Sequence, residues 1–305
     1  VLMRVQTQVT EHLSTLQEQL KLNHMFLQRN ISTLKSGVYN HYPTAVTLAS
    51  SYSSYSSQFN PDNQGLYIRP GVTMSNDGLK FFAINEYSSN NVYEYDLTTA
   101  YDLSTAGTTA TDSFDPPNSY AGDLSFSPDG TNMYLVTTSN NRIIQYTLST
   151  PFDISTRGSA TTYDPGINVY GAKIVNAGST MFTQSYSSGT NLTLTKFTLS
   201  TPYDLSGTVT NNGGITLSAS TIGVTDVRNY GGDWSEDGKQ FIHGTITGTN
   251  DLFTIDFATA YDLNSTKTYN VANAQGRPGA VKVVDNGTKM IWGDETASVF
   301  RLYNI

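Results

Sequence analysis

Cysteine is absent from this chain of 305 residues. Its absence excludes disulfide bonds, thiol nucleophiles and zinc sites with cysteine ligands. Histidine is scarce, and the chain has His12, His24, His41 and His243. Only His243 falls among β-forming residues, where an ordinary strand position explains it better than catalysis does. We therefore expect no catalytic residue, no metal site and no cofactor.

Positive charge and long apolar runs are also in short supply. The chain has 17 Lys and Arg residues against 25 Asp and Glu residues, which gives a net charge of −8, and it has no basic stripe. Nucleic acid is therefore excluded as an expected partner. No run approaches the ~20 apolar residues that a membrane helix needs, so we expect no membrane insertion. The chain begins at Val1 without a signal-peptide pattern, which is consistent with a processed or longer protein.

What the sequence does have is a long internal repeat with three markers. The first is a turn, written SNDG, SPDG, SEDG and more weakly NAG and DNG, which ends at Gly78, Gly130, Gly238, Gly178 and Gly287. The second is a loop such as TAYDL or TPFDI, with its aspartate at Asp102, Asp153, Asp204 and Asp262, so that successive copies are 51, 51 and 58 residues apart. The third is a glycine that opens a β-rich run before each turn, at Gly71, Gly122, Gly171, Gly232 and Gly279.

Each repeat reads as four short antiparallel strands joined by turns. Asp-Gly and Asn-Gly favour two-residue hairpins in which both central residues have positive φ. Four such strands in about 50 residues are typical of a β-propeller blade. Five blades need about 240 residues, and Leu66 to Ile305 is 240 residues. The sequence therefore predicts an all-β fold, a five-bladed propeller of four-stranded antiparallel blades.

The last blade lacks an outer strand of its own, because the chain ends at VFRLYNI. Other outer strands read DSFDPP and TTYDPG, and the stretch before the first blade reads SQFNPD. We predict that residues 55–61 pair with the C-terminal blade, so that the propeller domain spans 55–305. Such pairing removes a sheet edge that would otherwise favour aggregation.

The SPDGxxxY turn followed by an apolar strand resembles the repeats of YVTN and lactonase-type propellers. The YDLSTA loop resembles propeller repeats common in proteins of marine bacteriophages and bacteria. The resemblance covers about four fifths of the chain and implies the propeller architecture, while propellers as a class carry many unrelated activities. The turns NAGST and DNGTK depart from the pattern, so altered hairpins are expected there.

Residues 1–36 follow a different pattern, a heptad seam of a coiled-coil helix. The predicted oligomerisation residues are Val9, Leu13, Leu16, Leu20, Asn23, Leu27, Asn30 and Leu34. Asparagine in a seam tends to fix register and strand number, and we favour a parallel homotrimer. A helix that packs on the propeller or on another partner is the alternative, and Asn23 and Asn30 can instead belong to a fraying end. Residues 37–54, rich in Ser and Tyr, are predicted to be a linker whose tyrosines pack on the side of the propeller.

The candidate ligand-binding residues stand just before the inner-strand glycines, so the ring should bring them to one face. They are Arg69, Tyr120, Tyr170, Tyr230 and Arg277. Tyrosine rings stack on sugars, and arginine binds carboxylates or phosphates. Tyrosines at blade edges can equally serve to cover the core between neighbouring blades.

A rod that gathers copies of a rigid head suits adhesion, because weak contacts combine through effective concentration. The leading hypothesis is a non-enzymatic virion appendage, a phage fibre or spike that binds a host-surface glycan or protein and contacts other virion proteins. The first alternative is an architectural virion decoration or collar protein. The second is a secreted or periplasmic lactonase-like or glycan-hydrolysing propeller, and the third is a cellular scaffold for peptides. Residues for such hydrolysis would come from the carboxylates that do not repeat, Asp123, Asp226, Asp233, Asp294 and Glu295.

Overall fold

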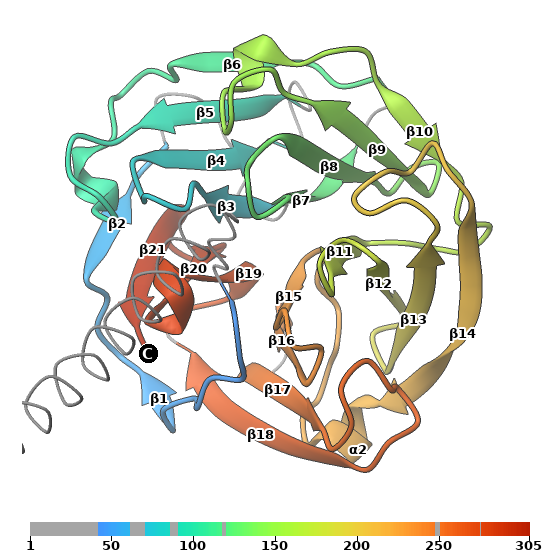
Figure 1. Cartoon of the computed structure of the whole chain (residues 1–305). Coiled ribbons are helices and arrows are strands. Elements are labelled where there is room, and N and C mark those ends of the chain that lie inside the picture. Colours follow the sequence, from blue (N-terminus) through green and yellow to red (C-terminus); the bar gives the residue numbers. More distant parts are fainter. Residues whose placement is uncertain (1–41, 62–70, 86–90, 118–119, 248–250, 275) are drawn as a thin grey trace, which may run out of the picture. The chain divides into compact units, whose positions relative to one another are not determined.

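The computed structural model describes residues 42–61, 71–85, 91–117, 120–247, 251–274 and 276–305 (Figure 1). The chain divides into two compact units, Val1–Tyr39 and Asn40–Ile305, and all described residues belong to the second unit. The predicted stem at 1–36, with its eight seam residues, lies outside the described residues, as does Arg69.

The described strands form five sheets. The first blade contains β3 (Val72–Met74), β4 (Lys80–Ile84), β5 (Val92–Asp96) and β6 (Asp112–Phe114). The second contains β7 (Ala121–Phe126), β8 (Asn132–Thr137), β9 (Arg142–Thr147) and β10 (Thr161–Tyr163). The third contains β11 (Gly171–Val175), β12 (Thr180–Ser187), β13 (Asn191–Leu199) and β14 (Val209–Ser218).

The fourth blade contains β15 (Gly232–Trp234), β16 (Gln240–Gly244), β17 (Asp251–Phe257) and β18 (Lys267–Ala274). The fifth contains β19 (Pro278–Val284), β20 (Lys289–Asp294), β21 (Val299–Asn304) and β2 (Ser57–Phe59). The inner strands β3, β7, β11, β15 and β19 contact one another in this order, and β19 contacts β3, which closes the ring (Figure 1). The prediction of a five-bladed, four-stranded antiparallel propeller is confirmed.

The ring is closed by β2, which lies within the segment 55–61 that the sequence assigns to this position. It pairs antiparallel with β21, with Ser57 opposite Leu302 and Phe59 opposite Phe300. The ring of Phe59 is buried against those of Phe81 and Tyr95 in the first blade. The chain segment before the first blade therefore completes the last blade and packs against the first.

The predicted linker is part of the propeller from residue 42 onward. Its β1 strand (Ser51–Tyr52) adds to β18 in parallel, as a fifth strand that the sequence does not predict. Tyr42 and Tyr52 are buried against the fourth and fifth blades. Tyr42 Oη donates a hydrogen bond to Gln240 Oε1, and Gln240 Nε2 donates to the carbonyl of Val46 at 2.9 Å. The burial of Tyr42 and Tyr52 agrees with the expectation that tyrosines of this segment pack on the propeller.

The Asp-Gly turns are four-residue loops, which corrects the predicted two-residue hairpins. In the first turn, Gly78 N donates to Ser75 O at 3.0 Å, and Ser75 N donates to Lys80 O at 2.9 Å. Gly78 has φ +69°, and Asp77 is not among the positive-φ residues. Asp77 instead accepts hydrogen bonds from Ser75 Oγ and Leu79 N. The aspartate shapes the loop through its side chain, which leaves the left-handed conformation to glycine alone.

The NAG and DNG turns are altered, as their sequences predict. Asn176, Ala177 and Gly178 all have positive φ, and so do Asp285, Asn286 and Gly287.

The two most regular markers of the repeat contact each other in space. Tyr101 N donates to Gly78 O at 2.9 Å, and a Cβ on Gly78 would lie 2.5 Å from the Tyr101 ring. The same contacts recur in the next blades, in the pairs Gly130 with Phe152, Gly178 with Tyr203 and Gly238 with Tyr261. The turn glycine is therefore required twice, for its backbone conformation and for the aromatic ring that covers it.

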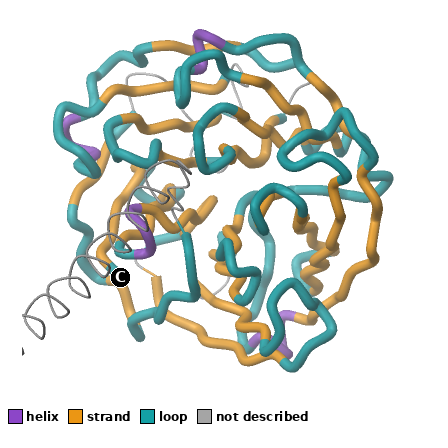
Figure 2. The backbone as a smooth tube through the Cα atoms, viewed as in Figure 1, coloured by secondary structure: helices purple, strands orange, loops and turns teal. Residues whose placement is uncertain are grey.

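The aspartates of the TAYDL-type loops cap those loops. Asp102 Oδ1 accepts from Ser104 N at 3.0 Å, at the start of the 3₁₀-helical turn η2 (Leu103–Thr105). Asp153, Asp204 and Asp262 accept the equivalent N–H groups. Described helices are single turns between strands, such as α2 (Ala219–Ile222) (Figure 2). None of the helices in the described ranges is long and apolar enough to cross a membrane.

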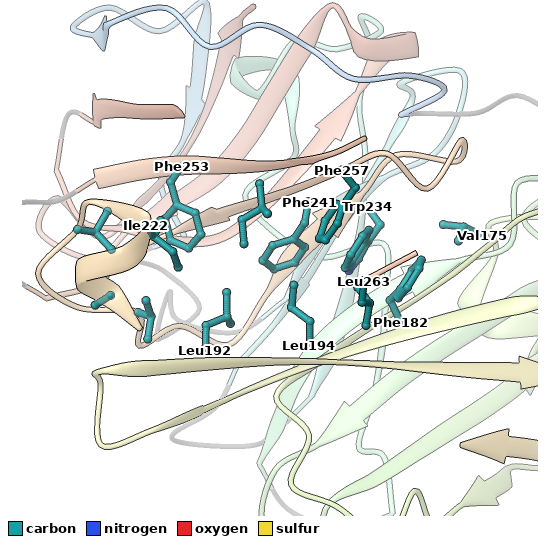
Figure 3. Packing of buried hydrophobic residues seen from close by; sticks show 14 residues of the cluster. Val175, Phe182, Leu192, Leu194, Ile222, Trp234, Phe241, Phe253, Phe257 and Leu263 are labelled. Carbon is teal, nitrogen blue, oxygen red and sulfur yellow. The ribbon is translucent and has the colours of Figure 1, made fainter. Parts of the chain in front are cut away.

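The hydrophobic core consists of five clusters, each between two neighbouring blades. Figure 3 shows the cluster between the third and fourth blades. Trp234 stacks on Phe182 with ring centroids 3.9 Å apart, and Phe241 and Phe257 pack around the indole. Because each cluster needs side chains from two blades, a blade cannot bury its apolar surface alone.

Candidate ligand-binding site

Tyr120, Tyr170, Tyr230 and Arg277 stand just before the inner strands of four blades, as predicted. Tyr170 and Tyr230, from neighbouring blades, make an edge-to-face contact with ring centroids 5.9 Å apart. Tyr120 is 48% exposed, with φ +65°. Arg277 is exposed, and its backbone N–H donates to Asp294 Oδ1 at 3.2 Å. The structure thus brings two of the five predicted residues into direct contact.

A third tyrosine, Tyr186, joins this contact and was missed by the sequence analysis. It lies near the end of β12 and stacks on Tyr170, with ring centroids 4.4 Å apart and an interplanar angle of 16°. The stretch SYSSG shows only a strand that approaches a turn. The pairing of β11 with β12, in which Tyr170 N donates to Gln184 O at 2.8 Å, decides that Tyr186 lies beside Tyr170. We call Tyr170, Tyr186 and Tyr230 the tyrosine cluster; all three are half-buried.

An ion pair stands next to the tyrosine cluster. Arg228 Nε and Nη2 donate to Asp226 Oδ2 at 2.8 and 2.6 Å. Gly189, three residues after Tyr186, leaves room for the pair, since a Cβ there would lie 2.7 Å from both Arg228 Nε and Asp226 Oδ2. The side chain of Arg228 is 46% exposed. The pair therefore presents guanidinium donors to solvent near Tyr186 of the tyrosine cluster.

The charges of this pair stabilise each other. Burial acts to raise the pKa of Asp226, but the hydrogen bonds from Arg228 outweigh it and hold that pKa below its usual value. The hydrogen bonds to Asp226 raise the pKa of Arg228, and the phenol of nearby Tyr186 adds to this. Both groups are therefore ionised at neutral pH. An arginine fork and a carboxylate can donate to and accept from hydroxyl groups, while tyrosine rings offer flat apolar faces.

The other non-repeating aspartates are also paired with cations. Lys173 Nζ lies 3.4 Å from Asp233 Oδ1, and Asp233 Oδ2 accepts from Val283 N at 3.0 Å. Arg301 pairs with Asp294. These contacts explain the carboxylates as parts of the fold. The described part of the chain contains no group of three or more acidic or histidine side chains placed to hold a metal ion.

Asp123 and Lys282 form a fully buried pair among the inner strands. Lys282 Nζ lies 2.9 Å from Asp123 Oδ1, and the two side chains are 2% and 1% exposed. The ammonium also donates to Gly232 O at 2.9 Å, and Asp123 Oδ2 accepts from Ala172 N at 3.2 Å. The pair thus connects four inner strands. Burial raises the pKa of Asp123 to about 6, against the opposing effect of Lys282.

His243 is part of the fold, as expected. It is 1% exposed, and its ring packs against those of Phe241 and Phe253. Burial lowers the pKa of His243 to about 3. The imidazole is therefore neutral in the folded protein at pH 7.

This neutral imidazole makes the folded protein sensitive to acid. Because the pKa of His243 is lower in the folded state than in the unfolded state, its contribution to stability is complete above about pH 6.5 and is lost as the pH falls toward 3. We expect the free energy of unfolding of the wild type to fall, relative to His243→Gln, by up to about 1.4 kcal/mol per pH unit in this range. Denaturant titrations from pH 4 to pH 7 measure the two slopes, and equal slopes would contradict the expectation.

No family model matches the chain, and no curated protein matches it. Solved structures are similar at low identity. A protein of unknown function from Desulfotomaculum acetoxidans is 14% identical, with a TM-score of 0.43 over 79% of this chain and 66% of that one. The periplasmic gluconolactonase of Pseudomonas aeruginosa is 13% identical, with a TM-score of 0.45 over 77% of this chain and 66% of that one.

The β-propeller domain of Swd1 from Myceliophteria thermophila is 9% identical, with a TM-score of 0.44 over 83% of this chain and 99% of that one. The chain spans just under two thirds of the length of the first two structures. At these identities and TM-scores, the similarities assign no activity. The five-bladed architecture rests on the strand pairing of this chain itself.

Proposed function

We propose that the propeller is a non-catalytic binding head that holds a saccharide against the tyrosine cluster. The observation that carries the proposal is the stack of Tyr170 on Tyr186, with Tyr230 at its edge and the Asp226–Arg228 pair beside it. Stacked rings offer an apolar face to the C–H surface of a sugar, and the ion pair offers donors and acceptors to its hydroxyls. Such a surface also fits the half-buried state of all three rings.

The wider proposal is attachment of a virion to a host surface. In this proposal residues 1–36 assemble a homotrimer, the heads bind a host-surface glycan, and the stem contacts other virion proteins. Several weak head contacts then combine through effective concentration. The virion part rests on the heptad pattern and on the likeness of the repeats to phage proteins, and the comparisons add no support to it. An architectural virion protein is the related alternative, and it requires no saccharide site.

A lactone- or glycan-hydrolysing propeller is the second candidate. The observation in its favour is Asp123, an inner-strand carboxyl whose pKa of about 6 suits proton transfer near neutral pH. Against it, Asp123 is 1% exposed and bonded to Lys282, so a substrate cannot reach the carboxyl in this arrangement. We therefore place binding ahead of hydrolysis.

Tyr186→Ala is expected to weaken saccharide binding about tenfold. Removing the ring takes away one stacking partner, a loss on the order of 1.5 kcal/mol. The full-length chain is screened on an array of bacterial surface polysaccharides, and the affinity of the best ligand is then measured for wild type and variant. Tyr269→Ala, at a half-buried tyrosine of the outer strand β18, is the matched control and should bind as the wild type does.

Three results would count against the proposed function. Absence of binding across the array would remove it, and equal affinity of Tyr186→Ala and wild type would place the site elsewhere. Conversion of a bound glycan or a lactone to hydrolysed product would favour the second candidate.

A further inference from the structure

Neighbouring blades are joined by a hydrogen bond that recurs along the chain. At three junctions, the residue after the loop aspartate donates its backbone N–H to a side-chain oxygen of the preceding blade. Leu103 N donates to Ser57 Oγ at 3.0 Å, Ile154 N to Glu94 Oε2 at 2.9 Å, and Leu205 N to Gln145 Oε1 at 2.8 Å. Such an N–H is buried by the junction and needs an acceptor.

The junction between the third and fourth blades lacks this acceptor. Lys196 occupies the position equivalent to Glu94 and Gln145. Each of the three residues lies in the third strand of its blade, directly before a buried aromatic residue. The ammonium of Lys196 donates to Tyr261 O at 2.8 Å, as Gln145 Nε2 donates to Tyr203 O at 2.9 Å. A lysine cannot accept a hydrogen bond. Among the described residues, nothing accepts the N–H of Leu263, the counterpart of Ile154 and Leu205.

A cavity of about 380 Å³ opens at this junction. Its lining includes Lys196, Asn212, Tyr261, Asp262, Leu263 and Asn264. The outer strand β14 shifts register against β13 between Thr195 and Phe197, beside Lys196. Gly214 fits there because it has no side chain, since a Cβ would lie 2.4 Å from Leu194 O. The cavity is therefore built by an irregularity of β14, because the other outer strands pair with their third strands without a register shift in the described residues.

The junction between the first and second blades shows what would complete the junction between the third and fourth blades. There the carboxylate of Glu94 accepts the N–H of Ile154 and pairs with the ammonium of Lys80. Between the third and fourth blades the N–H of Leu263 and the ammonium of Lys196 are present, and the carboxylate is the missing member. The loop aspartate Asp262 does not exclude a carboxylate from this place. At the junction between the first and second blades, Glu94 occupies the equivalent place although the charge of Asp153, the loop aspartate there, raises the pKa of Glu94.

We propose that the cavity binds an acidic sugar through its carboxylate. One carboxylate oxygen accepts the N–H of Leu263, and Lys196 supplies the positive charge. The exposed amides of Asn212 and Asn264 can donate to and accept from sugar hydroxyls. A carboxylate between an ammonium and a backbone N–H makes charge-assisted hydrogen bonds, which are stronger than neutral ones.

This site is distinct from the tyrosine cluster. Strands alternate in direction within a blade, so the loops before the inner strands and the loops after the third strands lie at opposite ends of the blades. Tyr230 precedes β15, whereas Tyr261 and Leu263 follow β17. The second site therefore does not depend on the function proposed for the first.

The test uses the full chain with D-glucuronate and its uncharged analogue D-glucuronamide, measured by saturation-transfer NMR and titration. We expect glucuronate to bind and glucuronamide to bind at least about tenfold more weakly, because a hydrogen bond to a charged group is lost. Lys196→Gln should abolish binding, since glutamine can repeat the contacts of Gln145, donating to Tyr261 O and accepting from Leu263 N. Its melting temperature should be no lower than that of the wild type, which separates lost binding from unfolding.

Lys267→Gln is the matched control. Lys267 lies in the fourth blade, which forms the other side of this junction. Like Lys196 it is half-buried and donates to a backbone carbonyl, here Ser265 O at 2.8 Å. Its variant should bind glucuronate as the wild type does. The proposal is overturned by equal binding of glucuronate to Lys196→Gln and wild type, by equal affinity for glucuronamide, or by no binding of glucuronate. Propionate, which carries the carboxylate without hydroxyls, should bind more weakly than glucuronate, and equal affinity would overturn the assignment to a sugar.

Discussion

Lys282→Met is expected to lower the free energy of unfolding at pH 8 by about 3–5 kcal/mol. The ammonium of Lys282 is the cation that pairs with Asp123, and both side chains are almost completely buried. Methionine fills a similar volume but leaves the Asp123 carboxylate buried without a partner. It also removes the hydrogen bond to Gly232 O. Chemical denaturation of the two proteins measures the difference.

The loss should shrink in acid, and its sign follows from the pKa of Asp123. Burial raises this pKa to about 6 in the folded protein, above the unfolded value of 3.8. The carboxyl therefore becomes neutral in the folded state as the pH falls through about 6, and an unpaired neutral carboxyl is far easier to bury. We expect a smaller difference between wild type and Lys282→Met at pH 5 than at pH 8.

Lys289→Met is the control for the loss of a lysine charge. Lys289 pairs with Asp285 at 3.1 Å, with side chains 24% and 31% exposed, and its loss should change stability by about 1 kcal/mol or less. A second variant, Asp123→Asn with Lys282→Met, removes both charges and should recover part of the loss. If Lys282→Met were no less stable than Lys289→Met, the buried pair would not hold the inner strands together.

Phe59→Ala is expected to cost about 3–5 kcal/mol, because it removes the anchor of the closing strand. Phe59 is 7% exposed and contacts Phe81 and Tyr95 of the first blade. Its strand β2 covers the edge of β21, and Ser57 on the same strand accepts the N–H of Leu103. A weakened β2 exposes that edge, so the variant should also aggregate more readily than the wild type.

Gln58→Ala separates closure of the ring from a general effect of mutation in β2. Gln58 lies on the opposite face of the strand and is half-buried, so its replacement should change stability by about 0.5 kcal/mol or less. Unfolding is followed by denaturant titration, and aggregation by sedimentation velocity. Equal stability of the two variants would show that the ring does not depend on Phe59.

The architecture was predictable because the information for a blade is local and repeated. The loop aspartates at 102, 153 and 204 recur every 51 residues, and each caps its own loop through a neighbouring N–H. The missing outer strand was predictable for the same reason, since the copy before the first blade matches the others in composition. A pattern that repeats five times specifies a fold even where a single copy is weak.

Contacts between blades were harder to predict, because no single segment encodes them. The register of β11 against β12 places Tyr186 on Tyr170, and the sequence near Tyr186 shows nothing unusual. Lys196 is informative only once Glu94 and Gln145 are known to accept hydrogen bonds from the next blade. The turn type was mispredicted because the side chain of Asp77 bonds within its loop, so glycine alone needs positive φ.

The contacts between turn glycines and loop aromatics make the two ends of the blades differ in how well they tolerate substitutions. At the end with Gly78 and Tyr101, one substitution disturbs two loops together, so a mutation there affects folding whatever the protein binds. At the end with Tyr170 and Tyr230, the pairing of a turn glycine with an aromatic ring does not recur in the described residues. The loops there are joined by backbone hydrogen bonds, such as Thr138 N to Tyr120 O at 2.8 Å and Glu295 N to Arg277 O at 3.1 Å. Because these bonds join backbone atoms, side chains at that end can change, and binding specificity with them, while the scaffold still folds.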